Sequence, residues 1–250
     1  MTRIVNIGEA LIDEITRPNS EPVEVVGGSM LNVAAGLTRL GHESELATWF
    51  GRDARGNKVR AHAEAAGVTL TPGSDGADFT TVAHATLDER GRATYEFDLS
   101  WDVPAVEDPD SVGHVHTGSY AVVLEPGADK VLAAVKRQAI RGTVSYDPNI
   151  RPALLGTPDE ARPHIEAIVA LSDVVKASDE DLEWLYPGRP VEDVIRQWSQ
   201  PVEDVIREWS QSGPSLILCT RGPWGVYIKA AAERDMLVVD PLDVELVDTV

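Results

Sequence analysis

The chain has 250 residues, of which 43% are hydrophobic and 25% are charged, a balance typical of a globular protein with a full core. Its 41 Asp and Glu against 22 Lys and Arg give a net charge of −19 and a pI near 4.6, which argues against a protein that binds nucleic acid or an anionic membrane surface. The single cysteine, Cys219, excludes an internal disulfide, and its apolar neighbours predict a buried thiol.

The first residues form a strand pattern. An apolar run over residues 4–8 predicts a buried strand, and residues 15–26 combine a turn cluster with short alternation, which predicts a hairpin outside the main sheet. The chain does not open on a basic region followed by an apolar run, and no stretch is long enough to span a membrane. We therefore expect a cytoplasmic protein without a membrane partner.

A glycine turn and the helix after it organise the amino-terminal half. Gly27 and Gly28 allow a sharp turn, Ser29 can cap a helix, and apolar residues then recur at helical spacing up to a stop at Gly41. Asn32 is a polar amide in the first turn of this otherwise apolar helix. A buried amide needs a hydrogen-bond partner. Asn32 is therefore expected to bond either a neighbouring loop or a ligand hydroxyl.

The next segment contains a predicted strand at residues 45–50 and a predicted helix at 56–66. Between them, residues 51–58 come near to a phosphate-binding P-loop. Asn57 intrudes before Lys58, however, and no Ser or Thr follows the lysine, so we reject a P-loop at this position.

Strand patterns at residues 79–87 and 94–99 flank a turn signal and predict a second hairpin. Because the two hairpins do not fit an alternation of strands and helices, a small second sheet that covers the main one is the economical interpretation. We expect a β lid of residues 15–26 and 79–103, and a main α/β domain of residues 1–14, 27–78 and 104–250.

One face of this lid should be apolar, and residues such as Phe97, Leu99 and Trp101 should lie on it. Such a face would either cover a ligand or pair with the lid of a second subunit. A homodimer through the lid is therefore one expected assembly.

Strand and helix patterns alternate through the rest of the chain, as in a doubly wound sheet. The predicted strands are residues 112–117, 143–146, 173–176, 216–220, 226–229, 236–239 and 244–247. The predicted helices are residues 126–140, 158–171 and 179–185. His114 and His116 would share one strand face and could form half of a metal site, but no third ligand lies nearby in the sequence.

Residues 190–200 are repeated at once as residues 201–211, and the two copies differ at a single position. The repeat length is close to three helical turns, so both copies would present the same face. A local duplication within a helix explains the pattern. Since a domain sized for one copy cannot cover both, either Trp198 or Trp209 should be the more exposed.

Polar side chains collect just past the carboxyl ends of the predicted strands, the edge at which open α/β sheets bind ligands. They are Asp13, Asn32, Asp147, Asn149, Arg151 and Lys176. Carboxylates and carboxamides can bind vicinal hydroxyls, which indicates a polyol. The cations and the glycine turns indicate a phosphate donor.

Several blocks together resemble the ribokinase-like (PfkB) carbohydrate kinases. Residues 27–41, followed by residues 51–56 (Gly-Arg-Asp-Ala-Arg-Gly), look like the amino-terminal signature of that family. Residues 8–13 (Gly-Glu-Ala-Leu-Ile-Asp) and 147–152 (Asp-Pro-Asn-Ile-Arg-Pro) resemble the fructokinase subgroup in particular. The order and spacing of the blocks match along the whole chain.

The resemblance implies a ribokinase-like α/β fold, in which helices flank a doubly wound central sheet and a small β-sheet forms a lid. It implies ATP and Mg²⁺ as cofactors, with K⁺ as a further candidate. At the sugar it implies Asp13, Gly27, Gly28, Asn32 and Asn149, with Arg151 as the catalytic residue beside the transferring phosphate. At the nucleotide it implies Lys176, Ser178, Thr220, Gly222 and Gly225.

Two departures from the family pattern bear on catalysis. Where the family usually has Asn-x-x-Glu to order Mg²⁺ and phosphate, this chain has Ser178 and Asp181, so Asp181 becomes the candidate Mg²⁺ ligand. Asp248 resembles the start of the second signature and is a candidate ligand of a monovalent cation, but the anion-binding turn and the general-base aspartate that follow it in the family are absent from these 250 residues. We therefore expect this chain to be impaired by several orders of magnitude in rate.

The sequence is thus interpreted as an ATP-dependent sugar kinase that acts on fructose or a related ketose, with sugar and ATP as partners and no nucleic acid. A nucleoside kinase or a 2-keto-3-deoxy-sugar-acid kinase is the alternative within the class, since the lid selects the sugar. A non-catalytic sugar-binding protein is the alternative from another class. Turnover with a panel of sugars separates the two classes.

Overall fold

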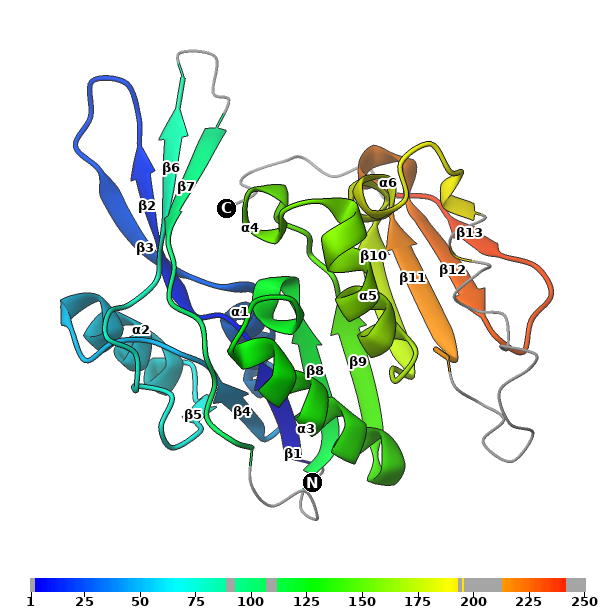
Figure 1. Ribbon diagram of the computed structural model, residues 1–250, viewed down its shortest axis with the longest axis horizontal. Coiled ribbons are helices and arrows are strands. Elements are labelled where there is room, and N and C mark those ends of the chain that lie inside the picture. The colour runs from blue at the N-terminus through cyan, green and yellow to red at the C-terminus, as the bar shows by residue number, and fades with distance from the viewer. Residues whose placement is uncertain (1–2, 89–92, 107–111, 193–194, 196–212, 242–250) are drawn as a thin grey trace.

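The computed structural model describes residues 3–88, 93–106, 112–192, 195 and 213–241, and its strands form two separate sheets (Figure 1). Most of the repeat at 190–211, with Trp198 and Trp209, lies outside the described residues, as do the predicted strand at 244–247 and Asp248. Among the helices that are described, none has the length and apolar character needed to cross a bilayer.

The main sheet has nine strands in the order β13-β12-β11-β10-β9-β8-β1-β4-β5. They are β1 (Arg3–Ile7), β4 (Ser44–Ala47), β5 (Thr69–Leu70), β8 (Val112–Gly118), β9 (Thr143–Asp147), β10 (Val174–Ser178), β11 (Leu216–Thr220), β12 (Val226–Ala230) and β13 (Leu237–Val239). Neighbours from β11 to β5 are parallel, and β12 and β13 are added antiparallel at one edge. The order proceeds outward from β1 in both directions, which confirms the doubly wound arrangement.

Helices cover both faces of this sheet (Figure 1). They are α1 (Ser29–Arg39), α2 (Ala54–Ala65), α3 (Gly127–Arg141), α4 (Pro152–Leu155), α5 (Pro158–Val169) and α6 (Asp179–Leu185), with short 3₁₀ turns η1 (Ser119–Val122) and η2 (Gly222–Trp224). Successive side chains of a strand point to opposite faces. In β4, accordingly, Leu46 packs in the cluster with α1 and α2, whereas Ala47 packs in the cluster with α3 and α5.

The small sheet has the order β3-β2-β6-β7 and stands apart from the main one (Figure 1). Its strands are β2 (Leu11–Thr16), β3 (Val23–Gly27), β6 (Val82–Leu87) and β7 (Ala93–Asp98). The antiparallel pairs β2–β3 and β6–β7 confirm the two predicted hairpins, and β2 joins them by pairing parallel with β6. Since β2 starts at Leu11, residues 11–14, which we expected in the main domain, belong to the small sheet.

Two residues predicted on the lid face lie elsewhere. Trp101 is buried in the main core, where its ring meets Tyr120 edge-on with centroids 5.5 Å apart and its Nε1 donates to the Ala121 carbonyl at 3.3 Å. Leu99 also packs against that core. Because β7 ends at Asp98, the chain has already left the small sheet at these positions, and only Phe97 of the predicted set lies within it.

The starts of two helices differ from the predicted ones because of side-chain contacts. The cap residue of α1 is Gly28, and Ser29 is the first helical residue, whose hydroxyl donates to the Glu9 carboxylate. Helix α2 starts at Ala54, earlier than predicted, because the Asp53 carboxylate accepts from the Gly56 amide at 2.7 Å. The short elements β5 and α4 were not predicted.

The two histidines of β8 share a face, as predicted, but both pack against a serine. The Ser145 hydroxyl lies 2.7 Å from His114 Nε2 and 2.8 Å from His116 Nδ1, and burial lowers the pKa of His116 to about 4. No cluster of three metal-ligating side chains occurs in the part of the chain that the structure describes. Cys219 is buried as predicted, and burial raises the pKa of its thiol to about 12.

Candidate functional site

The candidate site lies at the edge of the main sheet where its parallel strands end, beside the small sheet (Figure 1). Strand β1 ends there before Gly8 and Glu9, and β9 ends at Asp147. Neighbouring β10 and β11 end at Ser178 and Thr220. The parallel order thus brings the strand-end residues of the sequence motifs to one edge.

A glycine turn crosses this edge between the small sheet and α1. Gly28 has a φ of +114°, and a Cβ at this position would lie 2.5 Å from the Glu9 carbonyl oxygen. At Gly27 a Cβ would lie 2.0 Å from Asp13 Oδ2. Gly28 is therefore required, since a side chain there would collide with backbone atoms at a positive φ, whereas a side chain at Gly27 would have to displace the Asp13 carboxylate.

Glu9 belongs to the site although the sequence assigned it no role. Its carboxylate is buried and accepts from the Ser29 amide at 3.2 Å and from the Ser29 hydroxyl, while its Oε2 has no partner among the described residues. Burial raises the pKa of Glu9, and the charge of Arg151 opposes that rise. A carboxylate directly after a buried strand was the signal available in the sequence.

Asp13 of β2 lies within electrostatic range of the same arginine. Burial raises the pKa of the Asp13 carboxyl, and the positive charge of Arg151 acts in the opposite direction. Arg151 itself is exposed, and its Nη1 donates to the Ile150 carbonyl at 3.2 Å. The fold therefore brings a carboxylate of the small sheet and a guanidinium from the end of β9 within electrostatic range of each other.

Asn32 projects from the first turn of α1. Its side chain is exposed and has no hydrogen-bond partner in the part of the chain that the structure describes. The expectation that Asn32 bonds a neighbouring loop is therefore wrong, and its amide is free to bond a ligand. The helix nevertheless packs, because Leu31 and Ala34 fill its buried face.

A second polar group forms at the ends of β9 and β10. Lys176 Nζ lies 3.2 Å from Asp147 Oδ2, and the Asn149 amide donates to Asp147 Oδ1 at 3.2 Å. Asn149 adopts a φ of +39°, which turns the chain sharply after the strand. Burial raises the pKa of Asp147 although Lys176 opposes the rise. These predicted residues are therefore directly linked.

Asp181 connects the same loop to α6. Its Oδ1 accepts from the Ile150 amide at 2.7 Å, and its Oδ2 accepts from the Ser178 amide at 2.8 Å. The backbone amide of Asp181 in turn donates to the Ser178 hydroxyl at 3.0 Å, which completes a capping box. The buried Asp181 carboxylate thus has a structural role in this loop that the sequence did not reveal.

The predicted nucleotide residues of β11 lie one strand further along the edge. The Thr220 hydroxyl donates to the Ala177 carbonyl of β10 at 3.4 Å. Gly222 is exposed with a φ of +49°, and Gly225 is buried with a φ of +83°, where a Cβ would lie 2.0 Å from the Val239 carbonyl oxygen. Turn geometry alone thus explains Gly225, while Gly222 presents backbone to solvent.

Comparison with known proteins agrees with this fold along the whole chain. The family model of the pfkB family carbohydrate kinases matches residues 1–250. A fructokinase of Rhizobium leguminosarum bv. trifolii is 28% identical over 261 residues, which cover 99% of this chain and 75% of the relative. A fructokinase of Klebsiella pneumoniae is 30% identical over 230 residues, which cover 88% of this chain and 71% of the relative.

A similar solved structure is the crystal structure of a fructokinase double mutant from Vibrio cholerae O395 in its fructose, ADP and potassium-ion bound form. It matches with a TM-score of 0.76 at 22% sequence identity, over 98% of this chain and 77% of that one. The ribokinase-like fold predicted from the sequence is thereby confirmed.

Proposed function

Because this chain belongs to the pfkB family of carbohydrate kinases, we propose that it transfers the γ-phosphate of ATP to a hydroxyl of fructose or a related ketose. The observation that carries the proposal is that the fold places Asp13 of the small sheet, beside the glycine turn, and Arg151, after the end of β9, at one edge of the main sheet within electrostatic range of each other. A carboxylate that binds a sugar hydroxyl and a guanidinium that binds a phosphate are the two groups that phosphoryl transfer to a sugar must bring together.

The sugar is proposed to lie over the glycine turn. Asp13 accepts from sugar hydroxyls, the free amide of Asn32 bonds another hydroxyl, and the backbone of Gly27 and Gly28 lets the sugar approach closely. Asn149 is proposed to contact the same ligand from the end of β9. The relatives named as fructokinases support fructose as the first substrate to test.

The phosphates of ATP are proposed to lie along the ends of β9, β10 and β11. Arg151 is the proposed catalytic residue, since its exposed guanidinium can stabilise the charge of the transferring phosphate. The remaining nucleotide contacts are assigned to Lys176, Ser178, Thr220, Gly222 and Gly225. In a chain with a net charge of −19, these local cations and backbone amides must provide the attraction for an anion.

The carboxylates at this edge suit a Mg²⁺ ion that is held mainly by phosphate oxygens and water. Asp181 and Asp147 are the proposed protein ligands. Both carboxylates already accept hydrogen bonds from backbone amides, which leaves few lone pairs for the metal ion. When bound, Mg²⁺ neutralises the charge that develops on the phosphates. For a monovalent cation such as K⁺, Asp248 is the proposed ligand.

The experiment combines a sugar panel with two readouts, calorimetric binding and sugar-stimulated ADP release. Fructose, a nucleoside and a 2-keto-3-deoxy sugar acid are compared at equal concentration. We expect saturable fructose binding and ADP release that exceeds the release without sugar. ADP release with another member of the panel would replace fructose as the substrate, whereas binding with no release for any sugar would identify a non-catalytic sugar-binding protein.

The small sheet is proposed to act as a lid and, through its apolar face, as the interface of a homodimer. This face is opposite α2 and carries Val23, Val25 and Tyr95, which are 50%, 44% and 53% exposed. Exposed apolar side chains on the two outer strands of one sheet face favour burial against another protein surface.

Sedimentation velocity tests this assembly. We expect the protein to dimerise with increasing concentration and Tyr95→Lys to shift it to monomer, because a charged side chain in an apolar interface is costly to bury. Ile140→Lys is the matched control, since Ile140 is 78% exposed on α3, outside the small sheet. A monomer at every concentration, or an equal shift in both variants, contradicts the proposed interface.

A further inference from the structure

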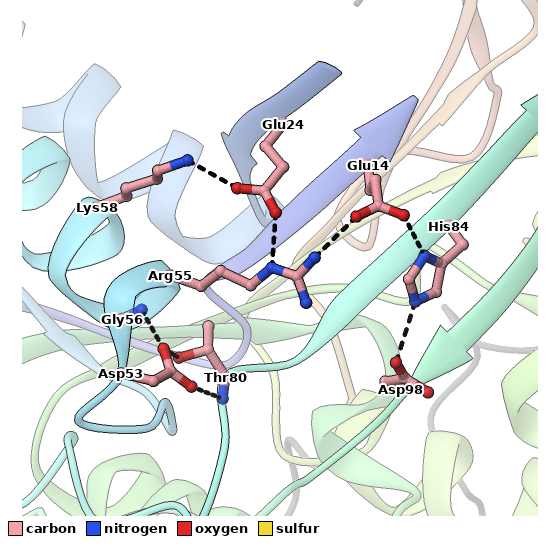
Figure 2. A network of polar contacts seen from close by, with 9 residues as sticks. All are labelled: Glu14, Glu24, Asp53, Arg55, Gly56, Lys58, Thr80, His84 and Asp98. Carbon is pink, nitrogen blue, oxygen red and sulfur yellow. Dashed lines mark hydrogen bonds and ion pairs between the residues drawn. The ribbon is translucent and has the colours of Figure 1, made fainter. Parts of the chain in front are cut away.

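The side of the small sheet opposite Asp13 carries a chain of ionic contacts that no part of the proposed reaction uses (Figure 2). Arg55 of α2 lies 2.7 Å from Glu14 of β2 and 2.7 Å from Glu24 of β3. His84 of β6 then lies 2.8 Å from Glu14 and 3.1 Å from Asp98 of β7. This network therefore touches all four strands of the small sheet and fastens them to one helix.

The network begins at Glu14, one residue after Asp13, the residue proposed to bind the sugar. Successive residues of a strand point to opposite faces, so Glu14 faces α2 while Asp13 faces the glycine turn. Asp13 is paired in register with Val25 on one side and Ala83 on the other, both apolar, which offer the carboxylate no bond of their own. The position of Asp13 therefore depends on how β2 is held by its other face.

The helix that receives these contacts is itself held in place. Asp53 caps α2 through the Gly56 amide, and its carboxylate also accepts from the Thr80 amide and from the Thr80 hydroxyl, each at 2.8 Å. Thr80 stands at the entry to β6. Figure 2 shows this group beside Arg55, so α2 is a fixed support against which the sheet can be oriented.

From this geometry we infer that Arg55 and His84 are positioning residues, which hold β2 against α2 and thereby keep Asp13 directed at the sugar. The inference rests on the proposed function, in which Asp13 binds a sugar hydroxyl. Arg55 bridges two strands with a side chain that is always charged. His84 links β6 to both β2 and β7 with a side chain whose charge changes within the ordinary pH range.

His84 can bond both of its partners only when it is protonated. A neutral imidazole has one N–H, so it can donate to Glu14 or to Asp98 but not to both. Hydrogen bonds to Asp98 and Glu14 raise the pKa of His84 above 6.5, and partial burial opposes the rise. The network should therefore be complete below pH 6.5 and should weaken as pH rises through the raised pKa.

The other charges around His84 favour its protonated form. Glu14, Glu24, Asp98 and Glu96, the register partner of His84, are acidic, and Arg55 and Lys58 are the basic groups of the network. Loss of the imidazolium thus leaves four carboxylates facing two cations. Repulsion between these carboxylates acts to separate β2 from β7, which is the displacement that would move Asp13.

The test measures two quantities over the same pH range, the amide-exchange protection of β2 in the free protein and the affinity for fructose. Histidine ring signals report the protonation of His84 from pH 6 to 9.5, amide exchange gives protection factors over β2, and calorimetry gives the fructose Kd at each pH. We expect protection of β2 to fall and Kd to rise, each by roughly threefold to fivefold, as His84 loses its proton. Partial exposure of the ion pairs limits the effect to this size.

His84→Gln is the decisive variant, because glutamine can donate to one carboxylate but cannot become charged. It should remain at the high-pH values of the wild type at every pH. His164→Gln, which changes an exposed histidine of α5, should follow the wild type, and Arg55→Gln should lower protection of β2 at all pH values.

Titration of β2 protection in His84→Gln like that of the wild type would overturn the inference, as would constant protection in the wild type while the His84 signals titrate. Absence of fructose binding at every pH, with β2 protection still following His84, would reject fructose as the substrate but leave the positioning of β2 standing. The two proposals therefore fail in different measurements.

Discussion

Replacing Asp13 with alanine should weaken fructose binding by about 1 to 3 kcal/mol, the free energy expected when a buried hydrogen bond to a ligand is lost. Asn32→Ala should weaken it within the same range, because the exposed amide has no hydrogen bond to any described residue that a ligand bond would have to replace. Calorimetric titration with fructose measures both effects. Burial raises the pKa of Asp13, so removal of this charge should leave the melting temperature unchanged or higher.

Each of these variants has a matched control. Asn57, like Asn32, is an exposed asparagine at the fourth position of its helix, so Asn57→Ala removes the same group at a place away from the site. Asp159→Ala removes an exposed carboxylate of α5. Both controls should bind fructose like the wild type. Unchanged affinity in Asp13→Ala and Asn32→Ala together would refute the proposed sugar site.

Gly56→Ala should produce a large loss of stability. A Cβ at Gly56 would lie 1.8 Å from the Gly51 carbonyl oxygen and 2.9 Å from Thr80 Oγ1. A backbone atom cannot move aside as a side chain can. Helix α2 would therefore have to shift away from Gly51 and Thr80, at a cost of about 3 kcal/mol. Thermal unfolding should therefore show a melting temperature lower by roughly 6 to 12 °C.

Gly36→Ala is the control, for which we expect a change in stability of the opposite sign in the same thermal-unfolding experiment. Gly36 also lies in a helix, α1, but nothing approaches its Cβ position within 4 Å. Alanine is favoured over glycine in a helix by about 0.5 to 1 kcal/mol, so this variant should be slightly more stable than the wild type. Equal destabilisation of both variants would show that the close contact at Gly56 does not govern the effect.

Much of the fold could be predicted from the sequence because its signals are local. Apolar runs and helical spacing depend on neighbouring residues, and they located the strands of the main sheet apart from β5, the two hairpins and helix α6 at Asp179–Leu185. The site edge was predictable for a related reason. Parallel strands must end at one edge, so Asp147, Lys176 and Thr220 come together whatever the details of packing.

Other features depend on contacts between residues far apart in the chain, which no local pattern encodes. Trp101 was predicted on the lid face but fills the core beside Tyr120, because the strand ends before it. The family resemblance makes Asp181 a candidate Mg²⁺ ligand, and only the structure shows that its oxygens also accept from the amides of Ile150 and Ser178.

The same limit applies to the groups that the sequence missed. Glu9 gains its role from Ser29, 20 residues later, and Glu14 reaches His84 across 70 residues. The sequence by itself therefore determined the order of the elements and the edge at which we propose that a ligand binds, since both follow from periodicity and strand direction. Which polar groups are paired, buried or free at that edge was decided only by the tertiary structure, because a hydrogen bond or a burial cost depends on the partner that folding brings near.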